Sequence, residues 1–262
     1  MAIFERMLSR CNFLVNYFFT GGMVKMIDTI LVVQGPELNS VRHGLSHRLS
    51  VPPKLLPLPI GLTSVSRYLD EWQKRQDFCS EQPSKILVMG LCGSLCSKYQ
   101  PGDVVIYDEC VLLHESQLLR QKCNDVLTGK LQTYLQKRAS LVRSLTSDRL
   151  IHKAEEKQLL GKNTGAEVVD MEGFAILNFF AKLSISVAMV RVISDDSHHD
   201  LPDLSCAITS SGNLEPLPLA IAMFRKPIAA LQLIQNARKG LQVLQQVTNY
   251  LFTDNISSQY SD

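Results

Sequence analysis

Short apolar runs rich in β-branched residues recur along the chain, and each of them ends at a glycine, a serine or an acid. Stretches with helical spacing, such as MEGFAILNFFAKL at 171–183, separate these runs. Runs this short and apolar are typical of buried strands, and strands that alternate with helices indicate a parallel sheet. We therefore expect an α/β fold with a single domain, in which helices flank a central, mostly parallel mixed β-sheet. The clearest runs are TILVVQG at 29–35, KILVMG at 85–90, AEVVD at 166–170 and ISVAMVRVISDD at 185–196.

The expected domain occupies residues 27–252, from just before the first clear strand to the end of the last helical stretch. The length of 262 residues is sufficient for one sizeable core. Residues 1–26 are interpreted as an extension or as a start that does not belong to the native protein, and 253–262 as a flexible polar tail. The apolar part of 1–26 is too short to span a bilayer, but its aromatic and basic residues also fit weak membrane association through the N-terminus.

Charge and cysteine content bear on the class of partner. The formal net charge is +2 and the basic residues are scattered, so we expect no nucleic-acid partner. The seven cysteines are odd in number and match no disulfide scaffold, which favours free thiols and a cytoplasmic location. His198, His199 and Asp200 lie in a polar loop where solvated side chains are expected, so we assign neither a metal nor a cofactor.

Ligands of parallel α/β sheets bind beyond the carboxyl ends of the strands, so the residues at those ends are candidates for a site. After the run that ends at Gly90, GLCGSL at 90–95 predicts a turn. Its two glycines serve either the turn itself or the close approach of the backbone to a ligand. The candidates are Gly35, Gly90–Gly93, Ser147–Asp148, Asp170–Glu172 and Ser194–Asp195.

The acids at these strand ends suggest the chemistry. Asp170 and Glu172 lie two apart at the start of a helical run, so they do not face the same way. Glu172 is the candidate acceptor for a pair of ligand hydroxyl groups, and Asp170 the acid that favours the helix start. Asp195 ends an apolar strand, which suits a general acid or base. Arg191 in the same strand requires a carboxylate partner.

Three segments together resemble a known family. VVDMEGFAI at 168–176 and VRVISDD at 190–196 resemble the signature of the nucleoside phosphorylase/nucleosidase superfamily, of the purine nucleoside phosphorylase and uridine phosphorylase type. GLCGSLCSKYQPGDVVIYDE at 90–109 is similar to the glycine motif of that family and the strand that follows it. The closest pattern is that of 5′-methylthioadenosine/S-adenosylhomocysteine nucleosidases. The resemblance implies a phosphorylase/hydrolase-like fold and an enzyme, either an N-glycosidase or a nucleoside phosphorylase.

The resemblance also implies roles for individual residues. Asp195 would donate a proton to N7 of the leaving purine, and Glu172 would bind the ribose 2′ and 3′ hydroxyls with Met171 packed on the sugar. Glu37 corresponds to the acid that orients the attacking water. The implied substrate-binding set also contains Gly35, Cys92, Gly93, Leu150, Ile151, Arg191 and Ser194.

The same resemblance bears on the nucleophile. Hexameric phosphorylases of the superfamily hold phosphate with an arginine and a serine at the positions where this chain has Val88 and Leu91. Water is therefore favoured, which implies hydrolysis of a 5′-substituted adenosine of the methylthioadenosine/S-adenosylhomocysteine type with release of adenine. Arg42 or Arg191 could still contact a phosphate, which leaves open phosphorolysis with phosphate as co-substrate.

Two further alternatives remain. GNLEPLPLAIAMFRKP at 212–227 resembles a bacterial branch that includes hopanoid-associated phosphorylases, which act on adenosine attached to a lipid. The second alternative is a protein that keeps the fold and binds nucleosides without catalysis. The family implies a small-molecule nucleoside substrate and a homo-oligomer.

Overall fold

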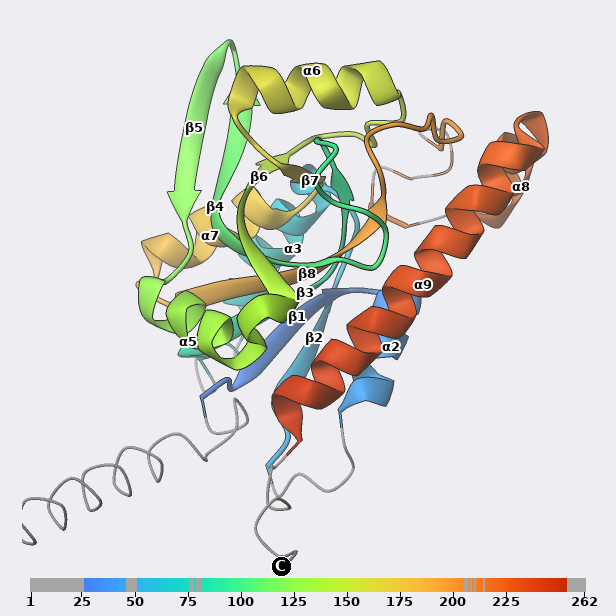
Figure 1. Ribbon diagram of the computed structural model, residues 1–262. Coiled ribbons are helices and arrows are strands. Elements are labelled where there is room, and N and C mark those ends of the chain that lie inside the picture. Colours follow the sequence, from blue (N-terminus) through green and yellow to red (C-terminus); the bar gives the residue numbers. More distant parts are fainter. Residues whose placement is uncertain are drawn as a thin grey trace, which may run out of the picture.

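The computed structural model describes residues 26–45, 51–75, 78, 82–204, 207, 209, 211–213 and 215–253 (Figure 1). The expected N-terminal extension and polar tail lie outside the described residues, except for Met26 and Thr253. The domain boundaries and the membrane association of the N-terminus therefore stay predictions. Among the described helices, none has both the length and the apolar character that a membrane crossing requires.

Eight strands form one mixed sheet in the described part of the chain. Five neighbouring pairs are parallel (β1–β2, β1–β3, β3–β8, β4–β6 and β6–β7), and three are antiparallel (β3–β7, β4–β5 and β4–β8). The predicted α/β fold with a mostly parallel mixed sheet is thus confirmed. The strands are β1 (Thr29–Val33), β2 (Lys54–Leu58), β3 (Lys85–Ser94), β4 (Val104–His114), β5 (Gln117–Lys122), β6 (Ala139–Thr146), β7 (Val168–Asp170) and β8 (Ser186–Asp195).

The sheet closes on itself, because β3 pairs with both β7 and β8 while β4 connects β8 to β6 and β6 pairs with β7. β1 and β2 extend it beyond β3, and β5 extends it beyond β4. β2 is an edge strand, which suits Pro57 within it because proline has no N–H to donate to a ladder. The closed circuit brings the carboxyl ends of β3, β6, β7 and β8 towards one another.

Helices cover both faces of the sheet (Figure 1). On one face α3 and α7 pack against each other over a core that includes Val65, Leu69 and Phe180. On the other face α2, α5 and α9 cover a core that includes Val41 and Leu244. The helices are α2 (Pro36–Gly44), α3 (Leu62–Gln73), α5 (Asp125–Leu135), α6 (Ala154–Thr164), α7 (Gly173–Lys182), α8 (Pro216–Arg225) and α9 (Pro227–Phe252), with the 3-10 helix η2 at Gln136–Arg138.

Local sequence signals explain several helix ends. Gly165 ends α6 in the left-handed region at a φ of 68°, where a residue without Cβ is favoured. Pro227 is the first residue of α9, so it separates α8 from α9 as a proline at the first helical position does. Asn124 caps α5 by accepting a hydrogen bond from the backbone N–H of Leu127.

One prediction of local structure is wrong. The expected turn at 90–95 is instead the end of β3, which continues through both glycines to Ser94. Further along the chain, β4 and β5 form a hairpin that no sequence pattern predicted. That hairpin turns at Glu115 and Ser116, which have positive φ without being glycine, so its turn lacks the usual sequence signal.

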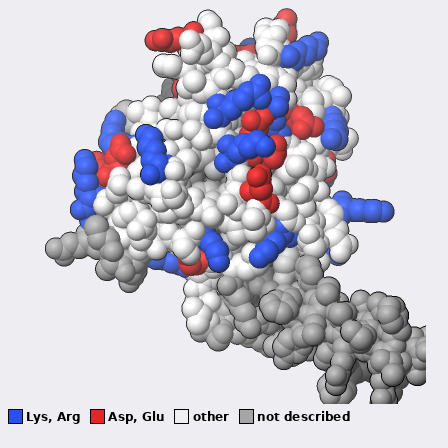
Figure 2. All heavy atoms as spheres, turned by 90° about the vertical axis from the view of Figure 1, so that its left-hand side faces the viewer, with Lys and Arg blue, Asp and Glu red and all other residues white. Residues whose placement is uncertain are grey.

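Charged side chains of both signs share the face that carries β4, β5 and β6. Figure 2 shows Lys and Arg lying beside Asp and Glu on one side of the molecule. Glu109 on β4, for example, accepts hydrogen bonds from Arg120 on β5 (3.1 Å) and Arg143 on β6 (2.5 Å). These pairs fit the small net charge of the chain.

Candidate active site

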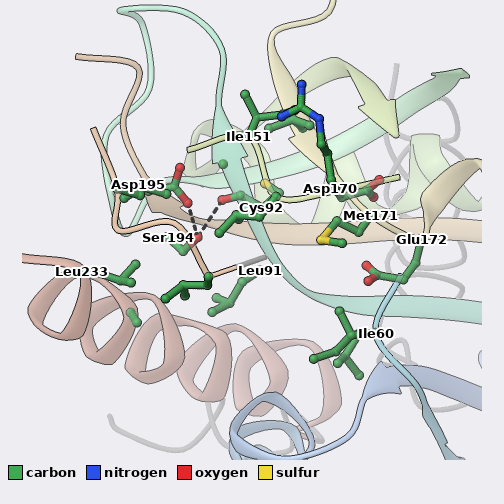
Figure 3. Close-up of a pocket in the computed structure, with 18 of the residues that line it drawn as sticks. Ile60, Leu91, Cys92, Ile151, Asp170, Met171, Glu172, Ser194, Asp195 and Leu233 are labelled. Atoms are coloured by element: carbon green, nitrogen blue, oxygen red, sulfur yellow. Dashed lines mark hydrogen bonds between the residues drawn. The ribbon is translucent and has the colours of Figure 1, made fainter. Parts of the chain in front are cut away.

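One pocket lies at the carboxyl ends of β3, β7 and β8, between them and α9, with a cavity volume of about 290 Å³ (Figure 3). That volume is near the lower end of the range for small-molecule sites. Nine of the eleven sequence-predicted site residues line it: Glu37, Cys92, Gly93, Leu150, Ile151, Met171, Glu172, Ser194 and Asp195. Gly35 and Arg191 do not line it, because Gly35 precedes α2 as its N-cap and Arg191 is buried inside the sheet.

Glu172 lies at one end of this pocket, beside Met171 (Figure 3). It follows β7 and is the N-cap residue of α7. Its Oε1 accepts a hydrogen bond of 2.9 Å from the backbone N–H of Gly61, the N-cap residue of α3. Burial raises the pKa of Glu172 to about 7, and the nearby Arg191 partly offsets this rise. The side chain is therefore a fixed, buried acceptor that changes charge near neutral pH.

Asp195 lies at the opposite end of the pocket, beside Ser194 (Figure 3). Ser194 Oγ is 2.7 Å from Asp195 Oδ1 and 3.2 Å from the carbonyl oxygen of Cys92. Asp195 Oδ2 accepts a hydrogen bond from Nζ of Lys157 on α6. Both carboxylate oxygens of Asp195 thus have a polar partner, and the residue as a whole is 7% exposed.

Arg191 occupies the space behind the pocket and faces three carboxylates. Its guanidinium nitrogens are 3.7 Å from Asp170, 3.9 Å from Glu172 and 4.0 Å from Glu37. This arrangement agrees with the expectation that Arg191 has a carboxylate partner. Asp170 also accepts hydrogen bonds from Thr146 Oγ1 (2.8 Å) and from the N–H of Gly173, the first residue of α7. Asp170 therefore binds the helix start, as predicted, and in addition neutralises part of the Arg191 charge.

Glu37 lies in the first turn of α2 and reaches across to β3. Its Oε2 accepts a hydrogen bond of 2.9 Å from the backbone N–H of Leu91. Burial raises the pKa of Glu37, while Arg191 opposes that rise. Its side chain remains 20% exposed, so it is the acid of this group that solvent can reach most easily.

Three glycines make room for the buried acids. A Cβ on Gly90 would overlap the carboxylate of Glu37 and the guanidinium of Arg191. A Cβ on Gly93 would lie 2.7 Å from Asp195 Oδ2, closer than real Cβ contacts. A Cβ on Gly173 would lie 2.5 Å from Asp170 Oδ2. The glycines of the 90–95 segment therefore do not reverse the chain. They leave space in which acidic side chains approach the backbone of β3.

The positions that hold phosphate in hexameric phosphorylases are apolar here. Val88 is buried in β3, and Leu91 lines the pocket. Arg42 is exposed on α2 and does not line the pocket. Among the described lining residues, Arg149 is the single cation, and its guanidinium pairs with Glu156. The lining acids are Glu37, Asp170, Glu172 and Asp195.

Lys157 is the residue of this site that sequence reasoning missed. A lysine in a helix with several other charged residues is normally exposed, whereas Lys157 is fully buried. The signal that was available is its spacing, because Lys157, Gly161 and Thr164 fall on one face of α6 and that face packs inward. Arg149, Leu201, Leu204 and Leu233 also line the pocket without having been predicted.

Comparison with known proteins gives one family and a set of solved structures. The model of the phosphorylase superfamily matches residues 33–206. No curated protein matches the chain. A 5′-methylthioadenosine/S-adenosylhomocysteine nucleosidase of Helicobacter pylori is 13% identical, with a TM-score of 0.61 over 83% of this chain and 94% of that one.

Two further solved structures are similar to this chain in fold at low sequence identity. Futalosine hydrolase of H. pylori is 14% identical, with a TM-score of 0.61 over 87% of this chain and 98% of that chain. A 5′-methylthioadenosine/S-adenosylhomocysteine nucleosidase of Streptococcus pneumoniae is 17% identical, with a TM-score of 0.58 over 85% and 98%. At these identities the likeness establishes the fold, and it does not transfer a substrate.

Proposed function

The chain belongs to the phosphorylase superfamily and is an enzyme that acts on the N-glycosidic bond of nucleosides, and we propose that it hydrolyses a 5′-substituted adenosine to release adenine. The observation that carries the proposal is the placement of Glu172 and Asp195 at opposite ends of one mostly apolar pocket. A purine nucleoside has hydroxyl groups at one end and a basic ring nitrogen at the other. The two carboxyl groups match these two ends.

Cleavage of the C1′–N9 bond leaves the electron pair on the purine and positive charge on the ribose. In the proposed mechanism Asp195 protonates N7, so that the purine leaves as a neutral base. Glu172 accepts hydrogen bonds from the 2′ and 3′ hydroxyls, with Met171 against the sugar. Leu150, Ile151 and Cys92 form the apolar surroundings of the base, which exclude water from the proton transfer.

Water is the proposed nucleophile. Among the described residues, four acids and one arginine line the pocket, and the arginine already pairs with Glu156. A phosphate anion would bind such a surface unfavourably. Glu37 is the proposed base for the attacking water, because burial raises its pKa while part of its side chain stays accessible. The charge of Arg191 is already compensated by buried carboxylates, which argues against a role as a phosphate ligand.

Adenine release from 5′-methylthioadenosine, S-adenosylhomocysteine and adenosine, each with and without phosphate, tests this proposal. We expect release without phosphate, an unphosphorylated ribose that keeps the 5′ substituent of the substrate as the second product, and faster turnover of a 5′-substituted substrate than of adenosine. Turnover that requires phosphate and yields a sugar 1-phosphate would assign phosphorolysis instead. Tight nucleoside binding with no base release under either condition would assign a binding protein.

An adenosine with a long apolar 5′ group is a second candidate substrate. Phe224 and Ile228, at the junction of α8 and α9, are 85% and 84% exposed, and Leu233 of α9 lines the pocket. An apolar chain that leaves the pocket along α9 would therefore meet apolar side chains. Faster cleavage of a 5′-alkylthioadenosine as the alkyl chain grows, lost in Phe224→Glu, would favour this candidate, and equal rates for all chain lengths would contradict it.

The expected homo-oligomer and the cytoplasmic location remain predictions. Light scattering of the purified chain measures the first, and a mass of one subunit would contradict it. Fractionation of cells that produce the full chain measures the second.

A further inference from the structure

Lys157 has no exposed surface, although α6 is otherwise largely accessible. Its Nζ donates to Asp195 Oδ2 and, at 2.8 Å, to the carbonyl oxygen of Asp196. Removing a lysine ammonium from water is costly unless it is paired and hydrogen-bonded. An apolar side chain would fill the same space without that cost, so packing alone does not account for a lysine at this position.

The contacts of Lys157 fix the orientation of the Asp195 carboxylate. Lys157 holds Oδ2, and Ser194 Oγ lies 2.7 Å from Oδ1. Gly93 allows the carboxylate to lie against β3, where the register between β3 and β8 shifts so that Gly93 pairs with Asp195. The carboxylate is thus confined from three sides and is presented at one end of the pocket (Figure 3).

Other charged groups nearby are engaged elsewhere. The side chain of Asp196 accepts hydrogen bonds from the backbone N–H of His198 and His199 and contacts the His199 ring. Arg149, which lines the pocket, pairs with Glu156. The thiol of Cys92 on β3 is buried, and burial raises its pKa, so it stays neutral. Among the described residues that line this end of the pocket or pack on it, Lys157 is the cation that contacts Asp195.

We propose that Lys157 is a positioning residue for the general acid, and this inference rests on the proposed function. As the C1′–N9 bond breaks, its electron pair passes to the purine and the proton of Asp195 passes to N7. Asp195 is left as a carboxylate, and the Lys157 ammonium beside Oδ2 stabilises that product. Lys157 itself neither touches the nucleoside nor gives up a proton.

Substitution of Lys157 tests the inference in the full-length chain. Lys157→Met removes the charge at nearly constant length, and we expect kcat for adenine release to fall about 10²-fold with KM changed less than about 3-fold. Lys157→Arg keeps the charge and should recover most of kcat. Lys162→Met makes the same change at an exposed position of α6 and is the matched control, with wild-type kcat. If Lys157→Met does not fold, Lys157→Gln takes its place.

The turnover of each folded molecule separates positioning from a purely structural role. A structural role would lower the amount of active enzyme, so kcat corrected for the fraction of folded protein would be the same in Lys157→Met and in the wild type. Such equality therefore overturns the inference.

A double-mutant cycle completes the test. If Lys157 acts through Asp195, then Lys157→Met should cost less than about 3-fold in the Asp195→Asn background, against about 10²-fold in the wild type. Equal losses in both backgrounds overturn the inference while leaving the proposed function intact. Wild-type protein that releases no base from any nucleoside overturns the proposed function itself, and the inference with it.

Discussion

Arg191 Nη2 lies 3.7 Å from Asp170 Oδ2 inside the sheet, and both side chains are about 1% exposed. The same guanidinium faces Glu172 and Glu37, so one buried cation partly offsets the charge of three acids that border the candidate site. Burial works against the charge of Arg191, but the carboxylates outweigh it and raise the pKa of the guanidinium. The charge of Arg191 is therefore a condition for placing these acids in the interior.

Arg191→Met should destabilise the fold by about 3–5 kcal/mol, because removal of one partner leaves buried carboxylates without a compensating charge. Urea unfolding at neutral pH measures the free energy of unfolding. Arg42→Met, an exposed change on α2, is the control and should stay within about 0.5 kcal/mol of the wild type. Equal stability of Arg191→Met and the wild type would show that the buried ion pairs contribute nothing net.

Much of the fold was predictable because its signals are local. Buried strands such as β1 and β8 are short, apolar and β-branched, and their ends contain the residues that line the pocket. Because ligands bind at strand ends, the candidate site residues can be predicted without knowing the order of the strands in the sheet. The order itself, with its closed circuit through β3, β8, β4, β6 and β7, depends on pairing between distant segments, and the sequence pattern does not determine it.

The features that escaped prediction depend on tertiary contacts. β5 is largely exposed and has no apolar face, so its pattern does not indicate a strand. The spacing of Lys157, Gly161 and Thr164 indicates an inward face of α6, but the partner of Lys157 is Asp195 at the end of β8, which lies far away in the sequence. Gly90 and Gly93 were interpreted as turn or ligand-approach residues, whereas side chains from α2 and β8 occupy the space that they leave free.

The stability of the protein should fall between about pH 4.5 and pH 7 through Glu172. Burial raises the pKa of Glu172 from an ordinary value of 4.5 to about 7, so in this window the folded protein binds a proton that the unfolded chain has released. The contribution is at most about 1.4 kcal/mol per pH unit, and it is constant above pH 7. Urea unfolding at pH 5 and pH 8 measures it.

Glu172→Gln removes this titration, so the stability of the variant relative to the wild type should rise from pH 5 to pH 8. Glu71→Gln, at an exposed position of α3, is the control and should follow the wild type at both pH values. A difference between Glu172→Gln and wild type that is the same at pH 5 and pH 8 would contradict the raised pKa.

Gly93→Ala should impair catalysis more than folding. The added Cβ would lie 2.7 Å from Asp195 Oδ2 and would push the carboxylate from its place, and a displacement near 1 Å costs about 10²-fold in rate. Gly129→Ala is the matched control, because a Cβ there meets no atom within 4 Å. Within α5 that change should leave kcat unaltered and raise stability by about 1 kcal/mol. Wild-type kcat in Gly93→Ala would show that Asp195 does not need its present position.

The contact between Glu172 and the ribose predicts a selectivity as well as a rate. A hydrogen bond to a charged group contributes about 1.5–3 kcal/mol, so the wild type should prefer a ribonucleoside over its 2′-deoxy analogue by about 10- to 150-fold in kcat/KM. In Glu172→Ala the 2′ hydroxyl has no carboxylate to bind. Its absence from the 2′-deoxy analogue then costs no hydrogen bond, so most of the preference should disappear.

The ratio of the two substrates, measured for each variant, cancels any loss of folded protein. Glu71→Ala serves as the control and should keep the wild-type ratio. If Glu172→Ala slows both substrates and leaves their ratio unchanged, Glu172 acts on the site through Gly61 and Arg191 rather than through the sugar. The assignment of this end of the pocket to the ribose would then have to be abandoned.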